Sequence, residues 1–316
     1  MESKWLEDFL SVARTGNFSR SAEERHVTQS AFSRRIKALE QWVGVALVDR
    51  SSYPTRLTVA GEQFREVARD SMALLLKTRH DLRNVLNGDR NLLRIAVQHS
   101  LAGDFLAQWL AKLPLQRHGT MVRVSADDLH DCVRALEEGN ADFLVCHAHI
   151  DLPLDLDNER FPSLLLSEDK LIPVSRPDVR GQARHALRPE TGCPVRWLSY
   201  SADAFLGRTV ALTLEGQAPR LPLQAVFESA LVEALRAAAK AGLGVAWLPG
   251  NLIAADLASG QLVRAGPVNL DVPLQVRVFG NRASLTGERR ALWETAQNIA
   301  ERETADRLPA MHEVCA

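Results

Sequence analysis

The stretch "VTQSAFSRRIKALEQW", residues 27–42, predicts a short amphipathic helix with a basic outer face. Phe32, Ile36 and Leu39 recur at spacings of four and three, which is typical of the buried side of a helix. The opposite side carries small and basic residues, namely Ser30, Ser33, Arg34 and Lys37. No acidic residue precedes Glu40 on this helix. A helical face with cations and no carboxylates is suited to approach the phosphates of a nucleic acid.

The residues before this helix predict two more helices. Apolar residues recur at helical spacing over residues 5–13, and Gly16 ends that helix. Ser19 or Ser21 can cap a second, short helix, and Thr28 can cap the helix that follows. A short helix, a tight turn and a helix with a basic face form a helix-turn-helix, whose second helix enters the DNA major groove. The alternative is an ordinary surface helix that happens to carry arginines.

The next segment, "VGVALVDRSSYPTRLTVAG" at residues 43–61, predicts a strand, a turn at Pro54 and a strand ending at Leu57. Such a hairpin is a wing, and its side chains can touch the DNA backbone beside the groove. We therefore expect DNA contacts from helix and wing together, at Thr28, Gln29, Ser30, Phe32, Ser33, Arg34, Lys37, Arg50, Ser51 and Arg56.

A long helix is expected from Thr58 to about Leu86, because no proline interrupts this segment. One side of it alternates spacings of four and three, through Phe64, Ala68, Ser71, Leu75, Thr78, Leu82 and Val85. This heptad pattern predicts pairing with a second copy of the helix. We assign dimerisation to its apolar members, Phe64, Ala68, Leu75, Leu82 and Val85. The alternative is a single helix that packs against its own domain; "NGDRN" at 87–91 is expected to be a hinge.

Beyond residue 91 the pattern changes to apolar strands that alternate with amphipathic helices. The first set comprises strands at 92–97, 120–126 and 143–147, with helices at 101–112 and 129–138. The second set comprises strands at 170–175, 195–200, 221–227, 242–249, 261–266 and 272–280, with helices at 229–241, 250–258, 286–301 and one from residue 204. This order favours an α/β fold with a parallel sheet covered on both faces.

Ligands of such folds bind outside the carboxyl ends of the strands. The segments expected there are "QHS" at 98–100, "SYSADAF" at 199–205 and "FES" at 227–229, with His147 at the end of another strand. The candidate effector-binding residues are therefore His99, Ser100, Leu101, His147, Tyr200, Ser201, Phe205 and Phe227.

Simpler roles compete with this assignment. Ser100 and Ser229 can be plain helix caps, and His147 can be a hydrogen-bonded surface residue. No lysine or arginine is clearly placed in these segments to hold a carboxylate, although Arg208 lies on a helix nearby. An apolar or aromatic ligand held by a few hydroxyl groups is therefore expected.

Composition limits the class of protein. The chain has 316 residues, 46% hydrophobic and 24% charged, with a net charge of -1, which is typical of a soluble protein with several structural units. Residues 1–90 hold 15 Lys and Arg against 12 Asp and Glu, so the first part is basic and the rest acidic.

The start "MESKWLEDFL" is not a signal peptide, and no apolar run reaches membrane-spanning length, so we expect a cytoplasmic protein without membrane contact. The cysteines, Cys132, Cys146, Cys193 and Cys315, lack metal-ligand spacing, so no metal site and no cofactor are expected.

The segment from Phe9 to Glu62 closely resembles the N-terminal signature of LysR-type transcriptional regulators. The matching residues are Ala22, Gln29, Ser30, Ser33, Ile36, Leu39, Glu40, Gly44, Leu47, Arg50, Leu57, Thr58 and Gly61. Val43 and Val48 depart from the usual Leu and Phe, and both changes are apolar. The resemblance implies double-stranded DNA and a small-molecule effector as partners, self-association as a dimer or tetramer, and an inverted-repeat target.

The same resemblance implies an N-terminal all-α winged helix-turn-helix and a two-lobed, periplasmic-binding-protein-like effector domain. We expect the winged domain at 1–59, the linker helix and hinge at 60–90, the effector domain at 91–305 and a flexible tail at 306–316. Within the effector domain, lobe I is expected at about 91–163 and 268–305, and lobe II at about 164–267. Crossover strands near 162–168 and 262–270 would join the two lobes.

The stretches "KWLEDFL", "FSRRIKALEQ" and "GLGVAWLP" are similar to the HypT-like, hypochlorite-responsive branch of this family. Oxidant sensing needs an accessible thiol of low pKa or an oxidisable methionine. Met121 is the only methionine of the expected effector domain, in or beside a buried strand, and Cys193 is the thiol we would test. An oxidant-responsive regulator is therefore the alternative function.

Two other classes of protein fit the sequence less well. An α/β enzyme would need a catalytic motif, and the chain has no GxSxG, HExxH, phosphate-binding glycine loop or supported carboxylate pair, so no catalytic residue is assigned. An architectural DNA-binding protein without an effector would leave the large C-terminal region without a role.

Overall fold

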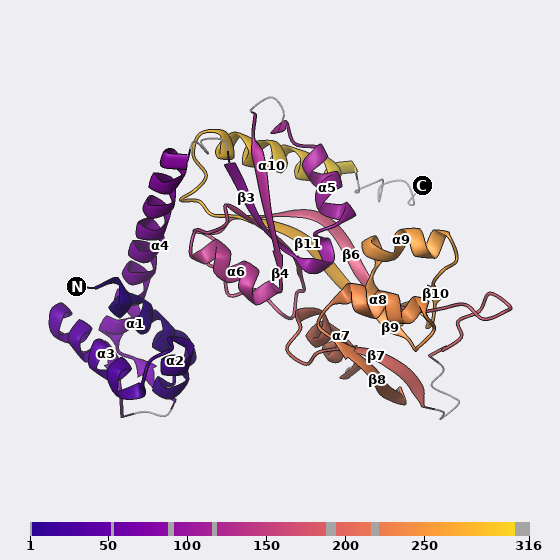
Figure 1. The fold of residues 1–316 in the computed structure, drawn as a ribbon, viewed down its shortest axis with the longest axis horizontal. Coiled ribbons are helices and arrows are strands. Elements are labelled where there is room, and N and C mark those ends of the chain that lie inside the picture. The colour runs from indigo at the N-terminus through magenta and orange to yellow at the C-terminus, as the bar shows by residue number, and fades with distance from the viewer. Residues whose placement is uncertain are drawn as a thin grey trace, which may run out of the picture. The chain divides into compact units, whose positions relative to one another are not determined.

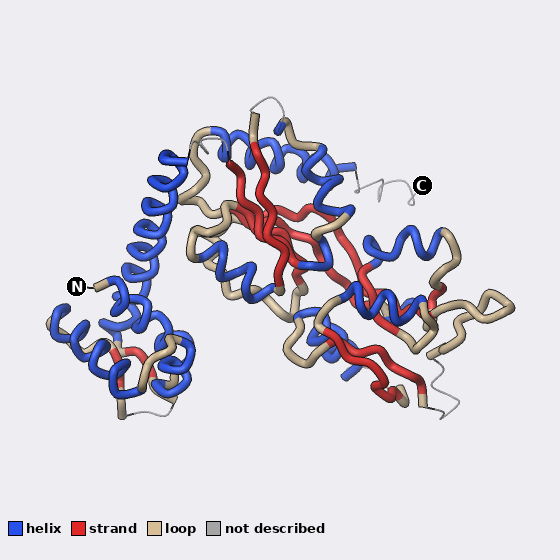
Figure 2. Tube along the Cα trace, in the orientation of Figure 1, coloured by secondary structure: helices blue, strands red, loops and turns tan. Residues whose placement is uncertain are grey.

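The computed structural model describes residues 2–51, 54–87, 92–115, 119–187, 194–215 and 221–306. The chain divides into two compact units, residues 1–88 and, apart from the turn at 138–140, residues 89–316. Figure 1 labels their elements, and Figure 2 separates helices from strands. Each unit has its own core. Among the described helices, none combines the length and the apolar character that crossing a membrane requires.

The N-terminal unit is helical with one small hairpin, as predicted. Its elements are α1 (Ser3–Thr15), α2 (Phe18–Glu24), α3 (Gln29–Val43), β1 (Val48–Asp49), β2 (Arg56–Leu57) and α4 (Val59–Asn87). The wing is confirmed, because β1 and β2 pair antiparallel. The N-cap of α2 is Asn17, which accepts from the amides of Ser19 and Arg20, so the expected serine caps were wrong. Thr28 caps α3 by accepting from the Ala31 amide at 3.3 Å.

A close approach fixes α4 to the wing. A Cβ atom on Gly61 would lie 2.0 Å from the Leu47 carbonyl oxygen, so glycine is required in the first turn of α4. Farther along α4, Phe64 packs edge-to-face on Phe9 with ring centroids 5.4 Å apart, and Ala68 is buried in the same core. The assignment of Ala68 to a dimer seam was therefore wrong, whereas Phe64 is half-buried and its assignment stays a prediction. The first turns of α4 face their own domain because the helix must cover α1 before it extends beyond it.

The first lobe of the C-terminal unit, lobe I, is a sheet with helices on both faces. Its strands and helices are β3 (Leu92–Gln98), β4 (Met121–Asp127), β5 (Phe143–Ala148), α5 (Asp104–Ala111), α6 (Leu129–Glu137) and α10 (Glu288–Asp306). Alternate side chains of β5 enter different cores: Phe143 and Val145 pack on the α5 and α10 side, whereas Leu144 and Cys146 pack on the α6 side. This explains why the strand is apolar at every position from Phe143 to Cys146.

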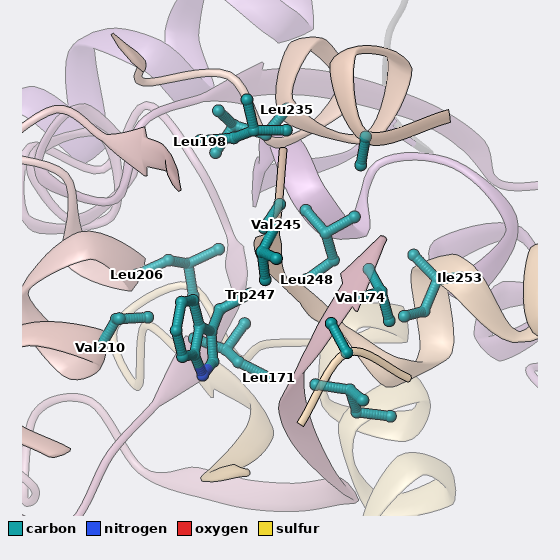
Figure 3. Packing of buried hydrophobic residues seen from close by; sticks show 14 of the residues in the cluster. Leu171, Val174, Leu198, Leu206, Val210, Leu235, Val245, Trp247, Leu248 and Ile253 are labelled. Atoms are coloured by element: carbon teal, nitrogen blue, oxygen red, sulfur yellow. The ribbon is translucent and has the colours of Figure 1, made fainter. Parts of the chain in front are cut away.

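The second lobe, lobe II, surrounds Trp247. Its elements are β7 (Val195–Tyr200), α7 (Phe205–Glu215), β8 (Leu223–Ser229), α8 (Val232–Lys240), β9 (Ala246–Pro249), α9 (Gly250–Ala258), β10 (Val263–Arg264) and the 3-10 turn η4 (Val268–Leu270). Trp247 is 1% exposed, and its indole N–H donates to the Leu270 carbonyl at 2.9 Å. Leu206 and Val210 of α7 and Leu171 of the long strand β6 (Ser163–Ser175) belong to the same core (Figure 3).

Two long strands connect the lobes. β6 (Ser163–Ser175) and β11 (Val272–Gly280) pair antiparallel over most of their lengths, with a register shift at Val276. One half of each strand packs in the core of lobe I and the other half in the core of lobe II. The first expected crossover therefore lies within β6. The second was misplaced at 262–270, since those residues form β10 and η4, and β11 makes the crossing.

The expectation of a purely parallel sheet was wrong in part. β3 pairs parallel with β4 and β5, and β7 pairs parallel with β8. β11, however, lies antiparallel between β5 and β6. The reason is that β11 returns from lobe II and enters lobe I in the opposite direction. The helix expected at 101–112 is also divided, into the 3-10 turn η1 (His99–Leu101) and α5.

Candidate nucleic-acid interface and candidate effector site

The two adjacent arginines of α3 have different surroundings. Arg34 is exposed, and within the described residues its guanidinium has no hydrogen-bond or ion-pair partner. The Arg35 guanidinium lies 3.2 Å from the carboxylate of Asp8, whose side chain is 0% exposed. Arg25 of the helix-turn-helix turn also binds Asp8 at 3.0 Å, and Glu7 as well. Burial opposes the charge of Arg25, but the hydrogen bond to Asp8 and the charge of Glu7 outweigh it and raise the pKa of Arg25.

The outer face of α3 carries most of the residues predicted to contact DNA. Those with exposed positions are Thr28, Gln29, Ser30, Arg34, Lys37 and, on the wing, Arg50, Ser51 and Arg56. Ser33 is half-buried. Phe32 was wrongly included, because its side chain is 0% exposed and stacks edge-to-face on Phe18 at 5.7 Å. Phe32 holds α3 in place instead of offering a surface to DNA.

Arg50 joins the wing to α3. Its guanidinium donates to Ser33 Oγ at 3.1 Å and to Glu40 at 3.2 Å, and it lies over the Phe18 ring. Glu40 in turn accepts from the amides of Leu47 and Val48. The acid that ends the basic face therefore orients the wing and its arginine. These contacts hold the Arg50 side chain in place beside the exposed part of α3.

An open concavity of about 480 Å³ lies between the start of α2, α3 and the wing. Gln29, Ser33 and Arg50 line it, together with Asn17, Ser19 and Thr55. The last three were missed in the sequence analysis. Asn17 caps the start of α2 at this concavity, where its side chain accepts from the Ser19 and Arg20 amides. The signal available in the sequence was this cap, but only the fold brings it beside the wing.

Three exposed leucines of α4 lie beyond its contact with the N-terminal core, which ends at Met72. Leu75 and Leu82 from the predicted seam are more than half exposed, as is Leu74 beside Leu75. Val85 lies outside the side chains that the structure describes. Exposed leucines on one helix are costly in water, and they are typical of a surface that pairs with another chain.

In the C-terminal unit, two of the predicted strand ends meet in one hydrogen-bonded chain, which continues to an aspartate within β6. Ser100 Oγ lies 3.1 Å from Nδ1 of His147, and His147 Nε2 lies 3.4 Å from the carboxylate of Asp169. The His147 amide donates to the Gln98 side chain at 3.0 Å. Ser100 does not cap α5, whose N-cap Gly103 makes no side-chain bond, and His147 is fully buried, so both simpler roles were wrong.

The start of α9 continues this chain on the other side. The Asn251 amide donates to Asp169 at 3.2 Å, and a Cβ atom on Gly250 would lie 3.1 Å from the Asp169 carboxylate. Asp169 thus occupies the N-terminus of α9, where the helix dipole favours a negative charge. The two atoms of the Asn251 side-chain amide are buried and have no hydrogen-bond partner in the structure. Asp169 and Asn251 were not among the predicted residues.

The other candidate effector residues do not all join this chain. Leu101 is fully buried in the core of lobe I, so its inclusion was wrong. Tyr200 is buried in lobe II, and its hydroxyl donates to the Trp247 carbonyl at 2.8 Å. Phe205 packs against the core of lobe II, whereas Phe227 is partly exposed on β8. His99 is exposed and Ser201 half-exposed.

The described thiols are poor redox groups. Cys132 and Cys146 are buried. Burial raises the pKa of Cys132 to about 12 and raises the pKa of Cys146 further. Cys193 lies outside the described residues. Met121 is 57% exposed on the edge strand β4, so the expectation that it is buried was wrong. Within the described ranges, no three His, Cys, Asp or Glu residues are grouped to hold a metal ion.

Two protein-family models match parts of the chain. "Bacterial regulatory helix-turn-helix protein, lysR family" matches residues 3–62, and "LysR substrate binding domain" matches residues 86–299. YjiE, an HTH-type transcriptional regulator of Escherichia coli K12, is 31% identical over 95% of each chain. LysG of Mycobacterium tuberculosis H37Rv is 30% identical over 87% of this chain and 86% of its own length.

Solved structures agree. DarR of Vibrio fischeri, determined in complex with DNA, is 32% identical and covers 94% of this chain and 99% of its own, with a TM-score of 0.59. Full-length HypT of Salmonella, a hypochlorite-specific LysR-type regulator, is 30% identical over 96% of this chain and 99% of its own, with a TM-score of 0.58. The fold and the site define a DNA-binding transcriptional regulator with a substrate-binding domain. The chain belongs to the LysR family of transcriptional regulators.

Proposed function

We propose that the exposed face of α3 reads a specific double-stranded DNA site, and that the wing positions it. The observation that carries this is Arg34, which is exposed on α3 beside Gln29 and Ser30 and has no partner in the described part of the chain. Arginine and glutamine form paired hydrogen bonds with guanine and adenine edges. Arg50, Ser51 and Arg56 would contact phosphates. The DarR complex supports this proposal, because that relative was determined bound to DNA.

The exposed leucines of α4 support self-association through this helix. A pair of α4 helices would hold two winged domains, and two such heads would read the half-sites of an inverted repeat. We assign the winged domain to 1–59, the pairing helix and hinge to 60–90, the effector domain to 91–305 and a tail to 306–316. Association of dimers into tetramers belongs to the same proposal.

The C-terminal unit would bind a small molecule where Ser100, His147 and Asp169 meet. Binding there changes how the lobes are connected, and this alters the spacing of the DNA-reading heads. The ligand can do so only through different affinities for the two arrangements. The protein would act in the cytoplasm by binding DNA and a ligand, without catalysis. The names of the relatives support this proposal, because both are transcriptional regulators.

An oxidant-responsive regulator is the second candidate. The exposed thioether of Met121 favours it, because an accessible methionine is oxidisable. The raised pKa of the Cys132 thiol opposes a cysteine sensor among the described residues. Mass spectrometry after a sub-stoichiometric hypochlorite treatment, combined with DNA-binding measurements, separates the two candidates. Oxidation of Met121 that leaves DNA binding unchanged would eliminate the oxidant role for this residue.

The proposed function is tested by selecting genomic fragments that bind the purified full-length protein, followed by footprinting. Enrichment of sites with inverted-repeat symmetry is expected, and the Arg34→Ala variant should not enrich them. Equal retention of all fragments at physiological salt would contradict sequence-specific recognition. Protection of a single, unpaired half-site would contradict the paired arrangement of the heads.

A further inference from the structure

Among the residues that the structure describes, the buried aspartate side chains share one pattern of ion pairs, with one exception. Four of them each lie within ion-pair distance of two cationic side chains: Asp8 (Arg25, Arg35), Asp142 (Arg94, Arg289), Asp256 (Arg236, Lys240) and Asp271 (Arg264, Lys170). The Asp169 side chain is equally buried, at 5% exposure. In the part of the chain that the structure describes, no lysine or arginine pairs with it. Lys170, its neighbour on β6, binds Asp271 instead.

Asp169 has two hydrogen-bond partners, and both lie at long distances from its carboxylate. His147 Nε2 approaches one carboxylate oxygen at 3.4 Å, and the Asn251 backbone amide approaches the other at 3.2 Å. Both distances are long for hydrogen bonds to a charged acceptor. A buried carboxylate without a cation is costly, because desolvation is not offset by an opposite charge. Among the described residues, the site therefore lacks the lysine or arginine that the comparable sites possess.

Asn251 supplies an independent indication of a missing group. Its side-chain amide offers two donors and an acceptor with two lone pairs, and none of them has a partner in the structure. Buried polar atoms are normally hydrogen-bonded. Because the backbone of Asn251 binds Asp169 directly, the unpartnered amide and the carboxylate without a cation belong to the same small region.

We propose that the effector is an organic cation, whose primary ammonium or guanidinium group binds the Asp169 carboxylate and whose remaining polar groups bind the Asn251 amide. The inference rests on the proposed ligand-controlled function. An anionic group is disfavoured at the same position, since Asp169 already occupies the N-terminus of α9. The binding energy comes from a charge pair in a place from which water is excluded, which strengthens it.

The same contact explains how the ligand acts. Ser100 and His147 belong to lobe I, whereas Asn251 belongs to lobe II and Asp169 to the connecting strand β6. Without ligand, the His147–Asp169 contact joins the two sides. A ligand cation replaces His147 as the partner of Asp169 and frees the imidazole. The connection between the lobes therefore changes when the ligand binds, which is the differential contact that a regulator requires.

The test uses full-length protein, treated with EDTA, in a buffer without primary amines. Melting temperature and titration calorimetry are measured with pairs of compounds that differ in charge: L-lysine and L-norleucine, L-arginine and L-citrulline, putrescine and 1,4-butanediol. We expect one cation to raise the melting temperature by several degrees at saturation, while its neutral counterpart has no effect.

Variants locate the interaction. Asp169→Asn keeps the shape and the acceptor for the Asn251 amide but removes the charge, so it should weaken binding of that cation at least about thirtyfold. Glu168→Gln, at an exposed position on the same strand, is the matched control and should bind as the native protein does. Asn251→Ala should weaken binding with an unchanged melting temperature of the free protein, because its side chain has no protein partner.

The possible outcomes test the cationic effector separately from the proposed function. Equal binding of the cation to native protein and Asp169→Asn would overturn the proposal. A response only to neutral or anionic compounds would also overturn it, while leaving a ligand-controlled regulator intact. No response to a cation, with sequence-specific DNA binding preserved in the same sample, would overturn the cationic effector alone. Loss of specific DNA binding in the native protein would instead refute the proposed function.

Discussion

Arg34 and Arg35 are neighbours in the chain, but only Arg35 reaches a buried partner. Its guanidinium lies 3.2 Å from Asp8, whereas Arg34 is exposed and has no partner among the described residues. One residue along a helix turns the side chain by about 100°, which is enough to separate the two environments. The charge of Arg35 therefore stabilises the domain, and the charge of Arg34 remains available for DNA.

Arg34→Ala should weaken DNA binding without lowering the stability of the domain. The loss should be about 1–3 kcal/mol if Arg34 reads a base. If it touches only phosphate, the loss should be similar for all sequences and the salt slope should fall by about one. Fluorescence anisotropy over a range of salt concentrations distinguishes these cases. Unchanged affinity would remove Arg34 from the interface.

Arg35→Ala should have the opposite profile. It removes one of two cations from the buried Asp8 carboxylate, so the free energy of unfolding should fall by about 1–3 kcal/mol. DNA affinity of the folded fraction should stay near that of the native protein. Urea unfolding and anisotropy on the same preparation give both quantities. A stable variant with weak DNA binding would show that Arg35 contacts DNA.

Leu75→Lys should reduce the oligomer size, because a charge at this exposed apolar position would be buried on pairing. Asp70→Lys, at another exposed position of α4, is the control and should keep the native size. Light scattering coupled to size-exclusion chromatography measures both. A Leu75→Lys variant that elutes as the native protein does would place the interface elsewhere.

Stability should fall in acid because of Asp256. Burial opposes ionisation of this carboxyl, but the hydrogen bonds and charges of Arg236 and Lys240 hold its pKa below the usual 3.8. A lowered folded-state pKa means that its stabilising contribution is present above about pH 4 and is lost as the pH falls through the folded value. Asp256→Asn should therefore make urea stability less steep between about pH 4 and pH 2. An unaltered slope would show that this carboxyl is not paired in solution.

The thiols of Cys132 and Cys146 should react slowly in the native protein. Burial raises both pKa values, so the nucleophilic thiolate is scarce at neutral pH. In a variant with Cys193→Ser and Cys315→Ser, a colorimetric disulfide reagent should label both remaining thiols rapidly only after urea is added. Rapid, complete labelling without urea would show that the α6 side of lobe I opens in solution.

Local patterns were sufficient for much of the fold. The buried face of α3 and the limits of β11 follow from periodicity, since each element must present apolar groups to a core. The wing follows from a turn residue between two short apolar runs. Pairing partners did not follow: β11 reads as one more strand of a parallel sheet, but its direction depends on the return of the chain from lobe II.

The sequence predicted only part of the candidate effector site. Ser100 and His147 follow from the rule that ligands bind beyond strand ends. Asp169 lies within a strand, and its partners are 22 and 82 residues away, at His147 and Asn251. No local pattern reports that a buried carboxylate lacks a cation, because the neighbouring Lys170 suggests one and the fold directs it to Asp271.

The sequence by itself determined the class of this protein, its order of helices and strands, and the basic helix of its winged domain. These properties depend on residue spacing along a few turns or one strand. Only the tertiary structure decided which of two adjacent arginines is free, which part of α4 is exposed, and which acid lacks a counter-charge. Those outcomes depend on distances between segments remote in the chain, which packing sets and spacing does not encode.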